Sequence, residues 1–164
     1  MNRFVCHPLL PVYDKCSKIL ILGTMPSPKS RENGFYYSHP QNKFWRIICE
    51  LLNYPLVSTP DEKKALLLKS NIALWDVLKS CNIVGADDSS IKNPKVNDIN
   101  IILNNANIKA VFTTGAKSTA LYKKYIYPET NVSSIYLPST SPANCRIPYE
   151  KIKDEYKVIL EFLK

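Results

Sequence analysis

Four short aliphatic runs, each closed by glycine, proline or polar residues, place the tightest constraint on the fold of this 164-residue chain. The runs are KILILG (18–23), NIALWDVL (71–78), IKAVFTTG (108–115) and SSIYLPS (133–139). Near-continuous apolar runs of this length are typical of strands buried on both faces of a parallel sheet. Segments with the apolar spacing of amphipathic helices separate or follow these runs, at 41–52, 61–69, 97–105, 116–126 and 148–163. We therefore predict an α/β fold with three layers, α/β/α, a central four-stranded parallel sheet, and one domain over residues 1–164.

Three long loops leave the predicted strands, at 24–40, 79–95 and 138–148. Ligands of open α/β sheets bind outside the carboxyl ends of the strands. We therefore expect these three loops to build the functional site.

The charge balance points to a polyanionic partner. The chain has 22 Lys and Arg against 14 Asp and Glu, a formal net charge of +8, and a sequence pI of about 9.2. A basic surface attracts nucleic acid by releasing the counterions condensed on its phosphates. DNA is thus a reasonable partner, although charge alone is a weak indication.

Other features of the composition exclude several classes of protein. No apolar run of about 18 residues occurs, and polar residues and prolines interrupt the first residues, so we expect a cytoplasmic protein that neither crosses a membrane nor carries a secretory signal. The five cysteines are scattered and form no C-x-x-C pair, which argues against a disulfide framework and against a zinc site. We expect reduced thiols, no bound metal, and a monomer.

The segment FYYSHPQNKFW (35–45) gathers aromatic rings and two carboxamides just after the first predicted strand. Flat, amphipathic side chains of this kind suit a flat ligand such as a nucleobase. Trp45, at helical spacing from Ile48 and Leu52, is better explained as a core residue.

The turns that follow the first and last predicted strands carry no phosphate-binding glycine loop. LGTMPSPKS (22–30) matches neither G-x-x-x-x-G-K-[ST] nor G-x-G-x-x-G, so nucleotide cofactors of those classes are not expected. At the last strand, PSTSPAN (138–144) offers small polar side chains that let a DNA backbone approach closely. The DNA-binding residues that we predict are Ser139, Thr140, Ser141, Pro142, Lys117 at the start of a helix, and Arg146.

In their order, five segments resemble the uracil-DNA glycosylase superfamily, most closely its hypoxanthine-DNA glycosylase branch, also called DNA-deoxyinosine glycosylase. They are GTMPS, FYYSHPQNKFW, IALWDVLKSC, FTTGAKS and PSTSPAN. The most specific part, HPQNKFW, resembles the His-Pro-x-Asn-Arg-Phe-Trp segment shared with the mismatch-specific glycosylases. The resemblance implies the three-layer fold, no cofactor, DNA containing deaminated bases as partner, and a pocket that takes an everted nucleotide for hydrolysis of its N-glycosidic bond.

Two departures from the superfamily pattern shift the expected chemistry. Many members place Asp, Asn or Glu two residues after the glycine of the first motif, where this chain has Met25, and a histidine in the second motif, where this chain has Ser-Thr-Ser-Pro. In the resembling branch the catalytic role belongs to the Asn of the aromatic segment, which corresponds here to Asn42. We expect the Asn42 carbonyl to hold a water at the anomeric carbon. Asp76, at the end of the second strand, is the alternative residue for positioning that water.

The flipped base needs a stacking partner, because base-aromatic stacking offsets the cost of unpairing by about 1–3 kcal/mol per base. We expect Phe44 to provide the stacking face, Tyr36 and Phe35 to close the pocket, and Gly23, Met25 and His39 to contact the base.

Other functions stay open at this point. The chain could act mainly on uracil or xanthine, or could be a non-catalytic damaged-DNA-binding protein of the same fold. A hydrolase based on Cys6 and His7 is disfavoured, because neighbouring residues on an extended chain point to opposite sides and we expect no partner carboxylate nearby.

Overall fold

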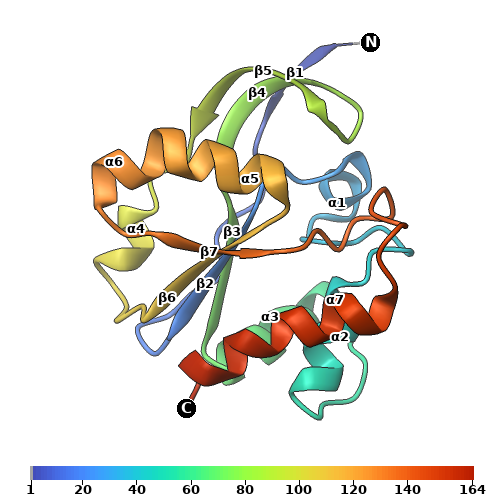
Figure 1. The fold of residues 1–164 in the computed structure, drawn as a ribbon, viewed down its shortest axis with the longest axis vertical. Coiled ribbons are helices and arrows are strands. Elements are labelled where there is room, and N and C mark those ends of the chain that lie inside the picture. Colours follow the sequence, from blue (N-terminus) through green and yellow to red (C-terminus); the bar gives the residue numbers. More distant parts are fainter. Residues whose placement is uncertain (1) are drawn as a thin grey trace.

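A computed structural model describes residues 2–164 and contains the predicted four-stranded parallel sheet (Figure 1). Its strands are arranged in the order β3-β2-β6-β7, with bounds Ile72–Asp76, Ile19–Gly23, Ala110–Thr114 and Ser134–Leu137. Every residue of β2, β3 and β6 is buried, as expected for central strands covered on both faces. The α/β prediction is confirmed.

Helices cover both faces of this sheet (Figure 1). One layer contains α2 (Phe44–Leu51), α3 (Pro60–Lys69) and α7 (Tyr149–Tyr156), which continues as a 3-10 helix over Lys157–Phe162. The other contains α4 (Asn100–Leu103), α5 (Ala116–Leu121) and α6 (Tyr127–Thr130), with a π-helical turn, Tyr122–Ile126, between the last two. Because the four strands are parallel, the turns after β2, β3, β6 and β7 lie at one edge of the sheet.

Part of the predicted loop 24–40 is a helix, α1 (Pro28–Asn33). The side chain of Ser27 caps it by accepting a hydrogen bond from Ser30 N, Pro28 occupies its first turn, and Gly34 ends it in the left-handed conformation. Each is a standard boundary residue for a helix. The loop prediction overlooked these signals because the segment is short and has no apolar stripe.

The prediction that 79–95 is a loop is wrong. A second, antiparallel sheet in the order β1-β4-β5 stands beyond the carboxyl edge of the parallel one, built from β1 (Arg3–Cys6), β4 (Leu78–Val84) and β5 (Asp87–Val96). Most residues of β5 are exposed, so its polar sequence gives no apolar alternation. Its pairing with β4 is also irregular, with register shifts along the hairpin. In Figure 1 this sheet lies at the top of the view.

The described residues, 2–164, include no helix long and apolar enough to cross a membrane. Cys49 and Cys81 are buried, the other three cysteines are exposed, and all five are free thiols. Within the same range no group of three or more His, Cys, Asp and Glu side chains is arranged to hold a metal ion.

Candidate active site

A cavity of about 290 Å³ lies at the carboxyl edge of the parallel sheet. Its walls come from the turn after β2, from residues of the aromatic segment, and from the turn after β7. Residues Ile83, Ala86 and Asp88 of the β4–β5 hairpin close a further side. The volume is close to the lower end for small-ligand pockets, roughly 300–1,000 Å³.

Most residues predicted for the site line this one cavity. They are Gly23, Met25, Tyr36, His39, Asn42, Asp76, Ser139, Thr140, Ser141 and Pro142. Four predicted residues do not line it: Phe35 and Phe44 are in the core, Lys117 is half-buried on α5, and Arg146 is exposed near the last turn. The roles assigned to the cavity residues stay predictions.

The expectation that Phe44 stacks on the base is corrected. Its side chain is fully buried, and its ring stacks on that of Tyr37 with 4.0 Å between centroids and 15° between planes. Tyr37 lines the cavity and stands between Phe44 and any ligand. The ring that can contact a ligand in the cavity is therefore that of Tyr37, and Phe44 packs against it in the core. Trp45 is in the core, as predicted, and donates from Nε1 to Tyr36 O (3.0 Å).

Asn42 is half-buried at the start of α2, and its carboxamide is oriented by the backbone. Its Oδ1 accepts a hydrogen bond from Phe44 N at 2.9 Å. An amide oxygen has two lone pairs, so one acceptor position and the two N–H donors are left for a ligand. One lone pair of the carbonyl oxygen that we predict to hold the water is thus already used, and this hydrogen bond fixes the direction of the carbonyl.

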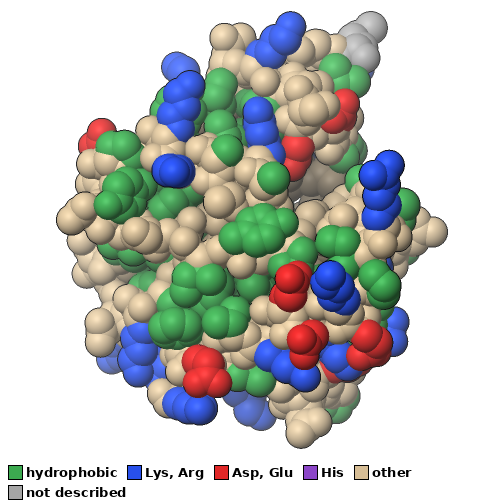
Figure 2. All heavy atoms as spheres, in the orientation of Figure 1, with side chains coloured by type: hydrophobic (Ala, Val, Ile, Leu, Met, Phe, Trp, Pro, Cys, Tyr) green, Lys and Arg blue, Asp and Glu red, His purple; other side chains and the backbone are tan. Residues whose placement is uncertain are grey.

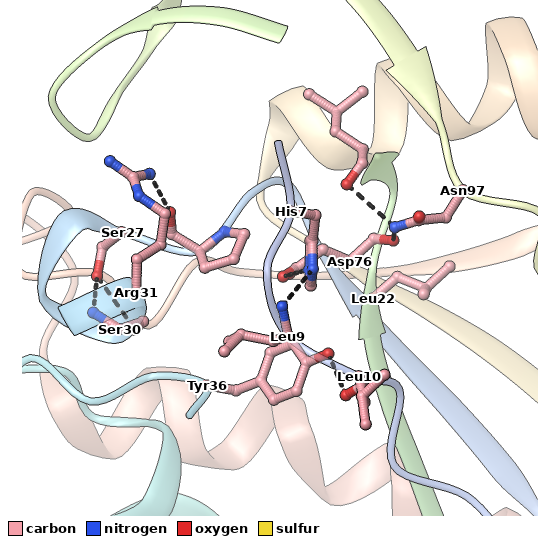
Figure 3. A network of polar contacts seen from close by, with 12 residues as sticks. His7, Leu9, Leu10, Leu22, Ser27, Ser30, Arg31, Tyr36, Asp76 and Asn97 are labelled. Atoms are coloured by element: carbon pink, nitrogen blue, oxygen red, sulfur yellow. Dashed lines mark hydrogen bonds and ion pairs between the residues drawn. The ribbon is translucent and has the colours of Figure 1, made fainter. Parts of the chain in front are cut away.

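Asp76 is buried at the end of β3 and is hydrogen-bonded to His7 (Figure 3). Asp76 Oδ2 lies 2.8 Å from His7 Nε2, and the two side chains are 5% and 2% exposed. His7 Nδ1 accepts from Leu9 N (3.2 Å), so Nδ1 is unprotonated and Nε2 carries the ring proton. His7 Nε2 therefore donates to Asp76 Oδ2, and the carboxylate oxygen is the acceptor of this pair.

His7 does not line the cavity but holds its Asp76 by a hydrogen bond, a contact that the sequence did not reveal. It follows β1, whose pairing with β4 brings Cys6 opposite Ser80 and carries the chain across the end of β3. The expectation that no carboxylate lies near His7 is wrong, because the partner is 69 residues away in the sequence. Cys6 is exposed and is not part of the cavity wall, so the Cys6–His7 hydrolase gains nothing from this contact.

Two buried hydroxyls in the cavity wall, those of Tyr37 and Thr140, have no hydrogen-bond partner among the described residues. Unpaired buried hydroxyls are costly unless a ligand or water binds them. Burial and the nearby Asp76 carboxylate raise the pKa of Tyr37, so its hydroxyl stays protonated at neutral pH and can donate. The cavity thus offers donors as well as the Asp76 acceptor.

Gly23 lets the Asp76 carboxylate and the Tyr37 hydroxyl converge. A Cβ at this position would lie 2.5 Å from Asp76 Oδ1 and 2.9 Å from Tyr37 Oη. Both distances are far below van der Waals contact. The free oxygen of Asp76 is therefore next to the Gly23 backbone, and only glycine fits there without displacing it.

We expect Gly23→Ala to reduce any activity that depends on this cavity by about tenfold or more, because the new methyl group displaces Asp76 and Tyr37. Overfilling a packed site also costs about 1–3 kcal/mol of stability. Gly34→Ala is the matched control, because Gly34 has φ +77 but no atom within 4 Å of the added Cβ. Equal losses of activity in the two variants, measured with their melting temperatures, would contradict a local effect on the cavity.

The turn after β7 is tied to the aromatic segment. Lys43 N donates to Thr140 O at 3.1 Å, and Asn144 Nδ2 donates to Ser139 O at 2.9 Å. These bonds place Ser139 and Thr140 beside Asn42 at the cavity rim. Two sequence segments separated by about a hundred residues therefore form one continuous wall.

Comparisons with known proteins agree with this architecture. The chain is 38% identical over 110 residues to a protein of Methanosarcina barkeri named Hypoxanthine DNA glycosylase, covering 66% of this chain and 70% of that protein. A protein of the same name from Methanosarcina acetivorans is 41% identical over 88 residues, covering 53% of this chain and 56%, little more than half, of that protein.

A solved structure shares the fold. The solution NMR structure of a candidate uracil DNA glycosylase from Methanosarcina acetivorans superposes with a TM-score of 0.81 at 27% identity, covering 94% of this chain and 96% of that one. Residues 10–164 match the Uracil DNA glycosylase superfamily. Since this match includes the whole parallel sheet and every residue that lines the cavity, the chain belongs to the uracil DNA glycosylase superfamily.

Proposed function

We propose that this protein is a DNA glycosylase that takes an everted deaminated base, with hypoxanthine as its main substrate, and hydrolyses the N-glycosidic bond to leave an abasic site. One observation carries the proposal: a single cavity presents the Asn42 carboxamide, the Asp76 carboxylate and the Tyr37 ring. The family and the names of the two Methanosarcina relatives support it.

Asn42 orients the attacking water in this proposal. Breaking the bond builds positive charge on the sugar and negative charge on the base, so a positioned water and donors near the base both lower the barrier. Asn42 takes no proton at neutral pH, and its contribution is alignment. The bond from Phe44 N holds Oδ1 in one direction, which leaves its second lone pair for the water.

Asp76 reads the base. An ionised carboxylate accepts hydrogen bonds and cannot donate them. Hypoxanthine carries an N1–H donor where adenine has an N1 lone pair, and uracil and xanthine also carry N–H groups. An acceptor fixed by His7 therefore favours deaminated bases over adenine and cytosine. Guanine shares the N1–H, so its rejection depends on the room left for its 2-amino group.

The reaction is monofunctional in this proposal. A bifunctional glycosylase needs an amine nucleophile at the sugar, and the described residues that line the cavity include no lysine. The expected product is an intact abasic site. Strand cleavage, or trapping of the protein on DNA by borohydride, would contradict this part of the proposal.

A single-turnover assay tests the proposal. Duplexes carrying deoxyinosine, deoxyuridine, deoxyxanthosine or deoxyadenosine are incubated with excess protein, and the released base is quantified. We expect hypoxanthine to be released fastest and adenine at least about a hundredfold more slowly, because the Asp76 acceptor is left facing a lone pair. Tight binding to the deoxyinosine duplex with no base release would favour the damaged-DNA-binding protein.

A further inference from the structure

A second groove, of about 510 Å³, runs between strand β5 and helix α5. We call it the lysine groove. It is formed by Lys92 and Pro94 on one side and by Lys117, Leu121, Lys124 and Tyr125 on the other. Figure 2 shows several Lys and Arg side chains gathered over this part of the molecule, where β5 faces α5. The groove thus combines three cationic side chains with an apolar floor.

The lysines of this groove have no carboxylate partner. Within the described residues, Lys92, Lys117 and Lys124 take part in no ion pair. The ammonium group of Lys124 lies 5.2 Å from the centroid of the Tyr125 ring. Three unneutralised charges around one groove repel one another, and an anionic ligand would remove that repulsion.

Another surface pocket of similar size shows the opposite arrangement. The pocket of about 530 Å³ beside α7 contains Lys153 and Lys157. Lys153 Nζ lies 3.0 Å from Glu50 Oε1, and Lys157 Nζ lies 3.0 Å from Asp154 Oδ1. Lysines that line a surface pocket of this protein can therefore be paired with carboxylates. The lysines of the lysine groove differ in having no such ion pair among the described residues.

The lysine groove adjoins the cavity through β5. Asp88 lines the cavity, and Lys92 is four residues farther along the same strand. A fully extended strand, at about 3.3 Å per residue, would separate these two residues by roughly 13 Å, and the register shifts between β4 and β5 make the separation shorter, so it corresponds to no more than about four base pairs of DNA at 3.4 Å each.

We propose that the lysine groove binds the sugar-phosphate backbone of duplex DNA on one flank of the everted nucleotide, within about four base pairs of it. This inference rests on the proposed function. The three ammonium groups contact phosphates, while Pro94, Leu121 and Tyr125 contact the deoxyriboses between them. Contacts of this kind position the duplex without reading its sequence.

The test removes the three charges together. We expect Lys92→Ala/Lys117→Ala/Lys124→Ala to weaken binding to a deoxyinosine duplex by about tenfold or more. The slope of log K against log salt should fall by about 0.9 for each phosphate that the variant no longer neutralises. Base release should be measured at saturating protein, where a loss of affinity alone no longer slows it.

The matched control is Lys153→Ala/Lys157→Ala/Lys164→Ala, which removes the same net charge from lysines that are already paired. We expect a small change in affinity and salt slope for this variant. Equal weakening in both triple variants would show that only net charge matters and would overturn the proposal. An unchanged affinity in the groove variant would also overturn it, and preferential loss of binding to an acidic peptide would assign the groove to a protein partner.

A scan with uncharged methylphosphonate linkages locates the contact. Replacing phosphates within about four nucleotides of the lesion should weaken the wild-type protein and leave the groove variant unaffected, because both changes remove the same interaction. Additive losses at every position would overturn the proposal. Since binding alone is measured, this result is independent of whether the protein releases hypoxanthine.

Discussion

Replacement of Asn42 by alanine is expected to slow hypoxanthine release in single turnover by about 10²–10³-fold, the range found when one positioned polar group is removed from an active site. Affinity for the deoxyinosine duplex should change by less than about threefold, because the carboxamide aligns a water and contacts no phosphate in our proposal. The variant also loses the bond to Phe44 N, which costs about 1 kcal/mol at a helix start, so a melting curve should accompany the kinetics.

Gln41→Ala provides the control for this prediction. Gln41 is the adjacent carboxamide, it is exposed, and it is not part of the cavity wall. Its removal should leave both the rate and the affinity near the wild-type values. A fully active Asn42→Ala protein would assign the water to another group, and a variant that loses affinity as strongly as rate would assign Asn42 to binding.

We expect Asp76→Ala to have the second large effect. The way in which the loss of rate varies between substrates distinguishes an Asp76 that accepts the base N–H from an Asp76 that activates the water. If Asp76 accepts the base N–H, wild-type protein should release 1-methylhypoxanthine, which has no N1–H, at least about a hundredfold more slowly than hypoxanthine. In Asp76→Ala the ratio of the two release rates, hypoxanthine to 1-methylhypoxanthine, should fall towards one. The variant has no carboxylate acceptor at position 76, so the N1–H of the base no longer matters. Released base in single turnover is the measurement for both substrates.

A water-activating Asp76 would behave differently. Its removal would slow the two substrates by the same factor and leave their ratio unchanged. The variant His7→Gln serves as a companion, because it removes the imidazole and leaves the Asp76 carboxyl in place. We expect an intermediate loss of discrimination, since Asp76 Oδ1 remains but its direction is no longer fixed.

The sequence predicts the central part of the fold well because its strands are buried on both faces. β2 and β3 are aliphatic or aromatic up to their last residue, β6 begins with an apolar run, and α2 has a clear apolar stripe. Ligands of open α/β sheets bind outside the carboxyl ends of the strands, and this rule alone places Gly23 and Asp76 in one site. The resemblance to a known superfamily adds Asn42 through the segment HPQNKFW.

The parts that could not be predicted depend on contacts between distant residues. The β4–β5 hairpin has a largely exposed outer strand, so no apolar period marks it. His7 meets Asp76 only because β1 pairs with β4. Phe44 and Tyr37 are both aromatic, and the sequence does not tell which ring faces the cavity and which supports it from behind. The structure settles this by burying Phe44 completely.

His7 follows β1, an edge strand of the antiparallel sheet, so the hydrogen bond that orients Asp76 in the cavity depends on the pairing of that strand. β1 is an edge strand of four residues with mostly exposed side chains, and the bond from His7 N to Lys79 O (2.8 Å) extends its pairing with β4. Short edge elements open at a small fraction of the free energy of global unfolding. If β1 detached from β4, Asp76 would lose the hydrogen bond from His7 while the parallel sheet stayed intact. If Asp76 acts as proposed, we therefore expect activity to be lost at a lower temperature than the one at which the parallel sheet melts, because β1 holds the donor to Asp76.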